Sequence, residues 1–293
     1  MSAGAQAARL ARAWSERRAR GLVAGLAAEV PLCVARPVRA SSTLLEREPE
    51  LEASVRAFLE RSGPQATGAG LEAKVRAVRC SVRDEQVEIA FAPTTWELGR
   101  AFHLALLSSP ELPPFAQHWL ESALEGRPLT PGLGAVHGLV VTSDGALVLM
   151  RRAAGVLYRP LHWAATFEEQ MIAEDCRGDD ALDAAIRRGV REELGLDTAR
   201  ARVEFLMPLV ELETLNFACL SLVRAAETAR EVRECAARAV DAVDVASLDF
   251  VAAEPGRLCE LAARGGAPAH TPLHPTSELR LLALARHLES ARP

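Results

Sequence analysis

Two adjacent glutamates, Glu192 and Glu193, are the residues whose type and spacing best suit a catalytic metal site. They lie in the run Arg-Arg-Gly-Val-Arg-Glu-Glu-Leu-Gly-Leu at residues 187–196. A divalent cation needs at least two carboxylates on one side of an element, and nearby helical positions can supply them. The macrodipole disfavours negative charge at a helix C-terminus, which a bound cation or a partner such as Arg188 would offset. Without a cation, the pair would be a solvated helix end bound to Arg188 and Arg191.

The helix that must position this pair is the clearest element in the sequence. Residues 179–194 begin with aspartates, which suit a helix N-terminus, and Gly195 is a strong stop signal. Apolar side chains recur at every fourth position, at Leu182, Ile186, Val190 and Leu194. This spacing predicts one face in the core and places Glu192 and Glu193 away from it.

The segment resembles the sequence motif of the Nudix family. That motif reads Gly, five residues, Glu, seven residues, Arg-Glu, an aliphatic residue, any residue, Glu-Glu, any residue, Gly and an aliphatic residue. The matching positions are Arg188, Val190, Glu192, Glu193, Gly195 and Leu196. The resemblance covers roughly 110 to 120 residues, and it is specific only in the right half of the motif.

The left half of the motif departs from the family pattern. Gly189 stands where the family has its first helix glutamate, Asp180 where it has the upstream glutamate, and Glu174 where it has the leading glycine. The family's Pro-Gly-Gly loop is replaced by residues 162–170, expected here to be a loop. A glycine inside a helix costs about 1 kcal/mol relative to alanine, so Gly189 predicts a close approach of that loop or of a ligand.

The resemblance implies a site and a reaction. Glu192 and Glu193 would bind Mg²⁺ (or Mn²⁺), and Arg188 would hold one of them or a neighbouring carboxylate. Glu168 and Glu169 would replace the missing carboxylate, since the preceding loop faces the same cleft in the family. Asp180 is a weaker candidate ligand, because a helix cap explains it better. The reaction would be hydrolysis of a nucleoside diphosphate-linked substrate.

Three functions stay open at this stage. The first is a Mg²⁺-dependent hydrolase of a small-molecule nucleotide derivative. The second is a catalytically inactive Nudix-like module that binds a nucleotide or a protein partner, for which Gly189 and the lost Pro-Gly-Gly loop argue. The third gives the N-terminal region a partner-binding role, including formation of a homodimer, and makes the second region a scaffold.

The chain is expected to be an α/β protein in two parts, divided by a Gly- and Pro-rich stretch at residues 126–134. Residues 1–131 form a smaller α+β region, with helices up to residue 36 and at 44–61, 96–107 and 114–124, and a hairpin at 78–91. Residues 132–293 form a Nudix-like α/β/α sandwich with a mixed sheet. Its expected strands are 136–142, 146–152, 203–212, 216–223 and 247–251, and its other helices are 227–240 and 278–290.

Composition excludes several classes of protein. A net charge of −5 with interspersed signs, and a single tyrosine, argue against nucleic-acid binding. No apolar run approaches the ~18 residues that cross a membrane, so a cytoplasmic location is expected. A single lysine among many arginines suggests a GC-rich bacterial genome.

Two sets of potential metal ligands are set aside. The six cysteines are scattered and interpreted as reduced thiols that lie mostly in the core. His270 and His274 are interpreted as part of a proline-stiffened surface loop, because no cysteine or acidic residue lies close to them in the sequence.

Overall fold

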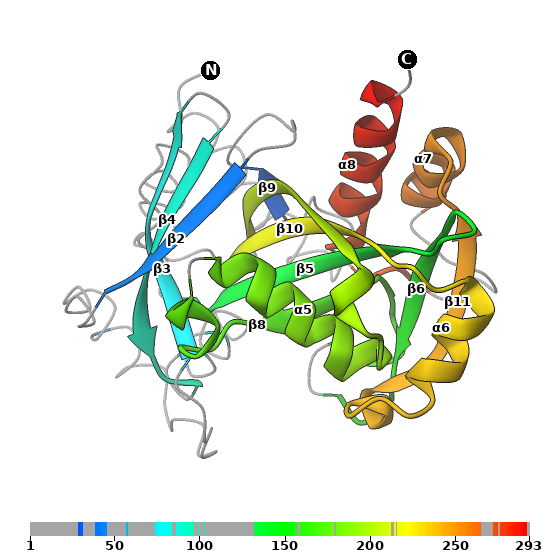
Figure 1. Cartoon of the computed structure of the whole chain (residues 1–293), viewed down its shortest axis with the longest axis horizontal. Coiled ribbons are helices and arrows are strands. Elements are labelled where there is room, and N and C mark those ends of the chain that lie inside the picture. The colour runs from blue at the N-terminus through cyan, green and yellow to red at the C-terminus, as the bar shows by residue number, and fades with distance from the viewer. Residues whose placement is uncertain are drawn as a thin grey trace.

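The computed structural model describes the residues 29–31, 39–45, 57, 74–83, 86–96, 99, 103, 132–156, 159–178, 180–211, 214, 216–264, 272–274 and 276–291. Most of these residues belong to a large mixed sheet with helices on both faces (Figure 1). The α/β class and the mixed sheet expected from the sequence are confirmed.

The large sheet has the strand order β1-β9-β10-β5-β6-β11. These strands are β1 (Glu29–Pro31), β9 (Arg202–Glu211), β10 (Phe217–Arg224), β5 (Gly134–Val141), β6 (Ala146–Arg152) and β11 (Val245–Ala252). The pairing of β10 with β5 is parallel, and the other pairings along this path are antiparallel. The expectation of a helix up to residue 36 is wrong for the described residues of that segment, which form strand β1.

The hairpin of β5 and β6 opens and admits two short strands. The described residues of β5 and β6 pair with each other only at Val141 and Leu147, next to the turn. Farther from the turn, β8 (Phe167–Gln170) pairs with β5, and β7 (Trp163–Ala165) pairs with β6. The expectation of a loop at residues 162–170 is therefore wrong. Strand pairing fixes the direction of each side chain in β8, because successive residues of a strand point to opposite faces.

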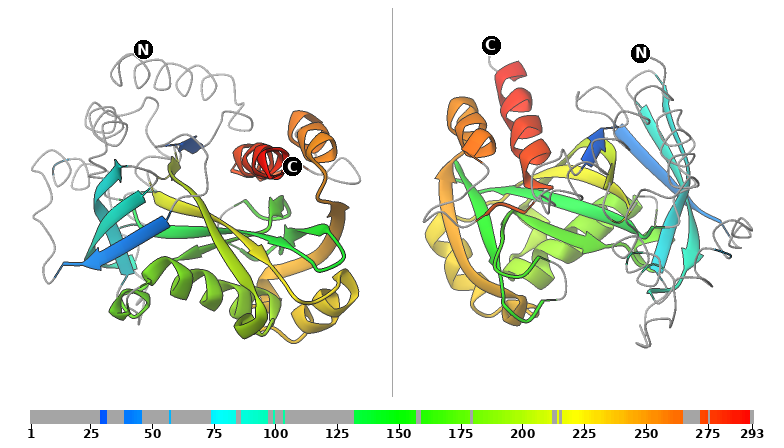
Figure 2. Two further views of the ribbon diagram at one scale, coloured as in Figure 1. Left: turned by 45° about the horizontal axis from the view of Figure 1, so that its top comes forward. Right: turned by 180° about the vertical axis from the view of Figure 1, so that it is seen from behind.

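Helices cover the two faces of the sheet in pairs (Figure 2). The helices α5 (Ala181–Leu194) and α6 (Ala229–Ala236) pack on one face against Val136, Val140 and Val148. The helices α7 (Pro255–Arg264) and α8 (Ser277–Ser290) pack on the other face against their strand neighbours Leu139 and Leu147. The alternation along β5 thus divides the protein into two cores. Helix α7 has no counterpart among the sequence-based expectations.

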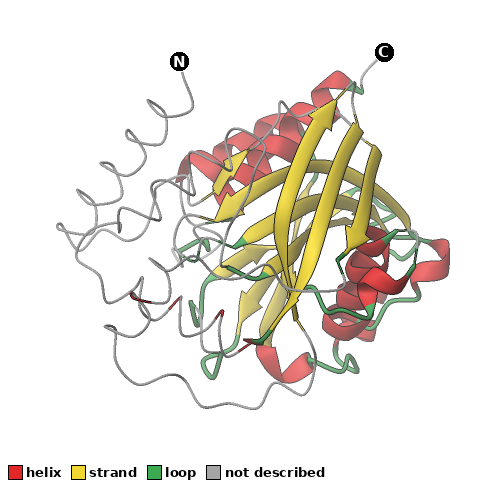
Figure 3. Ribbon diagram, turned by 90° about the vertical axis from the view of Figure 1, so that its left-hand side faces the viewer, coloured by secondary structure: helices red, strands yellow, loops and turns green. Residues whose placement is uncertain are grey.

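A second sheet of three strands packs beside the first (Figure 3). Its order is β2 (Arg39–Leu44), β4 (Gln86–Thr94) and β3 (Lys74–Arg83), so the hairpin expected at 78–91 is confirmed. Its apolar side chains share one core with α5, and Phe91 meets Phe217 of the large sheet edge to face at a centroid distance of 6.3 Å.

The remaining expectations for the N-terminal region fall mainly outside the described residues. These are the helix at 114–124 and most of the helices at 44–61 and 96–107. Leu44 itself ends strand β2 instead of starting a helix. None of the helices in the described ranges is long and apolar enough to cross a bilayer.

One aromatic ring sets the distance between α5 and the sheet. A Cβ added at Gly189 of α5 would lie 2.5 Å from the Phe167 ring, and one added at Gly138 of β5 would lie 2.2 Å from the same ring. Phe167 therefore fits between two glycines, and the ring cannot move away from one without meeting the other. This packing explains the glycine inside α5. It also confirms the prediction that the segment at residues 162–170 or a ligand approaches Gly189 closely.

We predict that Gly189→Ala destabilises the protein by about 1–3 kcal/mol, because overpacking outweighs the ~1 kcal/mol gain in helix propensity. Chemical denaturation measures the change. Gly256→Ala in α7 is the matched control, since a Cβ there meets nothing within 4 Å. Equal stability of the two variants would contradict this account of the Phe167 contact.

Candidate functional site

Arg188 is the centre of the candidate site. Its Nη1 donates to Glu169 Oε1 and to Glu192 Oε2, each at 2.9 Å. Its Nε and Nη2 donate to the two carboxylate oxygens of Asp175 at 3.0 and 2.9 Å, and Nη2 also reaches the carbonyl of Gln170 at 2.8 Å. Burial alone would lower the pKa of Arg188, but the hydrogen bonds that it donates to Asp175 and the charge of Glu169 raise it. The guanidinium is therefore a permanent charge that gathers three carboxylates.

Arg188 lies on α5, and its ion pair with Glu192 is a contact of the kind that the resemblance implies. Asp175 is a partner that sequence reasoning missed. It lies in the short 3₁₀ helix Asp175–Arg177 before α5, with its side chain 5% exposed, and its Oδ2 also accepts the amide of Ile172. An aspartate in a loop has no periodicity, so the sequence carried no signal for this role.

Glu169 occupies the space beside the glycine of α5. A Cβ at Gly189 would lie 3.2 Å from the Cβ of Glu169. The side chain of Glu169 therefore leaves its backbone close to the point from which a glutamate at position 189 would leave the helix. The register of β8 with β5 turns Glu169 towards α5. The side chain of Glu169 thus begins beside Gly189, on the adjacent strand β8.

Glu168 points to the opposite face of the sheet. Its Oε1 accepts from Thr276 and from Arg280 of α8, and it lies 3.2 Å from Nδ1 of His274. Burial alone would raise the pKa of Glu168, whereas His274 when protonated, and Arg280, lower it well below its usual range. Burial lowers the pKa of His274 to about 3, so Arg280 is the partner that keeps Glu168 ionised near neutral pH. The expectation that His274 belongs to a surface loop is wrong, since it is fully buried, while His270 lies outside the described residues.

Asp180 is the N-cap of α5. Its Oδ1 accepts the amide of Asp183 at 3.0 Å, and Gly195 ends the helix in the left-handed conformation at φ 64°. Asp180 is thus at the other end of the helix from Glu192 and Glu193, and it does not line the cavity described next.

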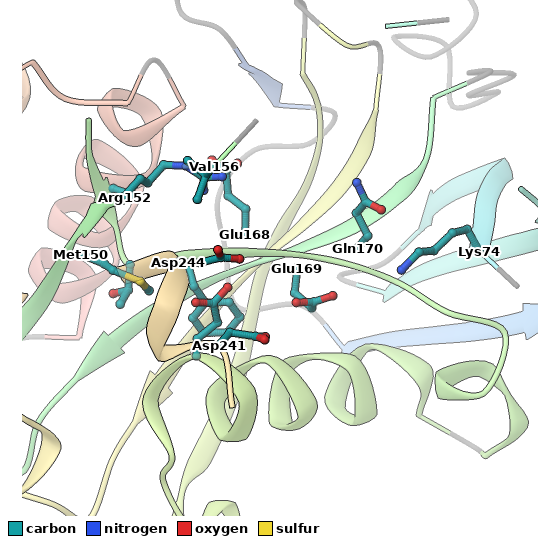
Figure 4. A pocket seen from close by; sticks show the side chains of 13 residues that line it. Lys74, Met150, Arg152, Val156, Glu168, Glu169, Gln170, Asp241 and Asp244 are labelled. Carbon is teal, nitrogen blue, oxygen red and sulfur yellow. The ribbon is translucent and has the colours of Figure 1, made fainter. Parts of the chain in front are cut away.

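A cavity of about 250 Å³ lies over the C-terminal half of α5 (Figure 4). Its polar walls are formed by Lys74, Arg152, Glu168, Glu169, Gln170, Glu193, Asp241 and Asp244. Lys74 and Arg152 lie at opposite ends, with carboxylates between them (Figure 4). Glu193 faces the cavity, whereas Glu192 is held beside it by Arg188. The cavity therefore has carboxylates at its centre and a positively charged side chain at each end.

The carboxylates of the cavity raise one another's affinity for protons. Burial, and then the charges of Glu169 and Asp241, raise the pKa of Glu193 to about 8. Burial also raises the pKa of Glu169 and that of Asp241, and in both cases Glu192 adds to the effect. Such a cluster is stabilised either by protons or by a cation.

The donor set fits Mg²⁺, because carboxylate oxygens are the ligands that this ion prefers. Among the described residues, no three of Glu169, Glu192, Glu193, Asp241 and Asp244 bring ligand atoms within 4.8 Å of one another. Mg²⁺ is usually held by one or two carboxylates together with water and substrate phosphates, so a looser arrangement is sufficient. Glu169 and Glu193 are the residues that would hold it.

No family model and no curated protein sequence matches this chain. Solved structures that resemble it include DR0079 from Deinococcus radiodurans, with 18% identity, 50% of this chain and 80% of that chain covered, and a TM-score of 0.35. The Nudix hydrolase RenU from M. smegmatis has 17% identity, 55% and 88% coverage, and a TM-score of 0.32. The MutT protein from Methanosarcina mazei Go1 has 14% identity, 54% and 95% coverage, and a TM-score of 0.34. The likeness is one of fold, and the case for a function rests on this chain's own residues.

We predict that the metal-free protein loses stability as the pH rises from about 5 to 9. The folded-state pKa of Glu193, about 8, is above its ordinary value of 4.5, so its contribution is complete below pH 4.5 and is lost as the pH rises through 8. Melting temperatures measured in EDTA across this range test the prediction. Glu193→Gln should flatten the profile, whereas Glu234→Gln, at an exposed site in α6, should not. Identical profiles for all three proteins would contradict it.

Proposed function

We propose that the chain is a Mg²⁺-dependent hydrolase that cleaves the diphosphate of a nucleoside diphosphate-linked substrate. The observation that carries the proposal is the replacement of the missing helix glutamate by Glu169. The motif lacks a carboxylate at Gly189, and the neighbouring strand brings one to the same side of α5. The cavity therefore keeps the acidic character that the motif alone has lost.

The acidic residues in and beside the cavity are assigned to the metal ion, and its basic residues are assigned to the substrate. A bound Mg²⁺ would supply a polarised phosphoryl oxygen and an acidified water. Arg188 fixes the positions of Glu169 and Glu192, so these carboxylates need no reorganisation when the cation enters. Glu169 and Glu193 would hold this cation.

The positively charged side chains of Lys74 and Arg152, at the two ends of the cavity, bind the substrate. Lys74 comes from β3 and Arg152 from β6, so anionic oxygens on either side of the scissile bond meet a positive charge. Lys74 is the residue through which the smaller sheet would contact the substrate.

The reaction itself is attack of water on phosphorus with cleavage of the P–O bond of the anhydride. The proton of the attacking water passes to a carboxylate, for which Asp241 is the candidate, because its raised pKa favours proton uptake and it lines the same cavity. The products are two phosphate esters, and the leaving phosphate carries away the electron pair of the broken bond.

One observation favours the alternative, an inactive nucleotide-binding module. Arg188 binds both Glu169 and Glu192, which lowers the negative charge available to a cation. An inactive module would bind nucleotides through Lys74 and Arg152 without turnover.

We predict Mg²⁺-dependent release of nucleoside monophosphate from at least one member of a panel of nucleoside diphosphate derivatives. The combined change Glu192→Gln and Glu193→Gln should lower kcat at least about 100-fold, as expected for loss of charge that stabilises the transition state. Glu231→Gln, at an exposed helix start, is the control and should turn over like the wild type. Nucleotide binding without turnover in any metal would instead establish the inactive module.

A further inference from the structure

A second cluster of ligand-type side chains lies on the α8 side of the sheet. His137 of β5, Glu168 of β8 and Glu211 of β9 each offer one ligand atom, and these atoms lie within 4.8 Å of one another. In the part of the chain that the structure describes, this is the one group of three such residues that is so compact. None of the three belongs to the motif on α5.

Strand register and alternation bring these residues together. His137 is directly opposite Glu168 in the pairing of β5 with β8, on the face where Leu139 and Leu147 pack against α7 and α8. Glu211 ends β9 and reaches the same place, with its Oε1 2.8 Å from Nε2 of His137. His137 is fully buried and Glu211 is 6% exposed, so the cluster is part of the protein interior.

The donor set has a specific preference among metals. One imidazole nitrogen with two carboxylate oxygens suits Zn²⁺, Mn²⁺ or Fe²⁺ better than Mg²⁺ or Ca²⁺, which take oxygen ligands. Ligands opposite each other across an ion with bonds of about 2.1 Å lie about 4.2 Å apart. Small side-chain shifts would therefore bring this cluster to coordination distances.

Surrounding hydrogen bonds hold the two carboxylates in place. Oε2 of Glu211 accepts from Oγ1 of Thr214 at 2.5 Å and from Nδ2 of Asn216 at 3.1 Å. For Glu168, the contacts with Thr276 and Arg280 are both made to Oε1, so Oε2 is not part of these bonds. Partners of this kind orient metal ligands in proteins. Arg280 and Arg152 are the cations that act on Glu168, whereas Glu211 is bonded to His137, Thr214 and Asn216.

A cavity leads to the cluster. It has a volume of about 430 Å³, and Glu168, Glu211, Thr214 and Asn216 are among the residues that line it. Glu168, Glu169 and Asp244 also line the cavity over α5, so the two spaces meet at the end of β8. An ion and its remaining water ligands therefore have both room and a route of entry.

We propose that His137, Glu168 and Glu211 form a second divalent-cation site, selective for Zn²⁺ or Mn²⁺ and separate from the site on α5. The cation binds His137 Nε2 and Glu211 Oε1 in place of the hydrogen bond between them, and the neutral imidazole then carries its proton on Nδ1. The remaining coordination positions face the cavity and are filled by water.

The test uses the full-length protein with both motif glutamates changed, Glu192→Gln and Glu193→Gln. We expect this protein still to bind one Mn²⁺, and electron spin-echo modulation of the bound ion to show coupling to an imidazole ¹⁴N. The site on α5 offers only oxygen ligands, so the nitrogen signal reports the second site alone. Failure to bind Mn²⁺, or binding without nitrogen coupling, would overturn the proposal.

Single changes then identify the ligands. His137→Gln and Glu211→Gln should each weaken Zn²⁺ binding at least about tenfold, measured by equilibrium dialysis. His162→Gln, at a histidine that bonds the carbonyl of Pro160, is the matched control and should bind as tightly as the unchanged protein. Unchanged affinity in both ligand variants would contradict the assignment. The result does not depend on hydrolase activity, so it separates this proposal from the proposed function.

Discussion

The ion pairs of Arg188 are the interaction on which the rest of the site depends. Removing a guanidinium from water is costly unless its donors are all paired, and here the pairing is made by Asp175, Glu169, Glu192 and the carbonyl of Gln170. These partners come from the loop before α5, from β8 and from α5 itself. One charge therefore fixes three segments relative to one another, and it holds carboxylates together that would otherwise repel. Burial is the main cause of the raised pKa values of Glu169 and Glu193, so these two carboxylates bind protons more readily than exposed ones do.

The packing of Phe167 makes that arrangement geometrically possible. The ring lies between Gly138 and Gly189, so β8 approaches α5 closely enough for Glu169 to reach Arg188. A glutamate at position 189 would meet Phe167 and Glu169 directly. The glycine at position 189 and the position of Glu169 beside it are thus two aspects of one packing arrangement.

The sequence predicted the elements that depend on local patterns and missed those that depend on distant pairing. The helix carrying Glu192 and Glu193, and the hairpin of β5 and β6, follow from periodicity and from the turn at Gly145. The strands β7 and β8 are short, and they form by pairing with a hairpin that opens to receive them. For that reason the sequence could not show that Glu168 and Glu169 face opposite sides. The burial of His274 beside Glu168 likewise depends on α8, more than 100 residues further along the chain than β8.

If Glu169 replaces the carboxylate missing from α5, the Glu169→Gln variant should differ from the wild type in the Mg²⁺ dependence of hydrolysis. Glu174→Gln, which removes an exposed glutamate from the loop before α5, is the control. We expect Glu169→Gln to lower the maximal rate at least about 100-fold, or to raise the Mg²⁺ concentration for half-maximal rate at least about tenfold, while Glu174→Gln behaves like the wild type. A wild-type Mg²⁺ dependence and rate in Glu169→Gln would contradict it.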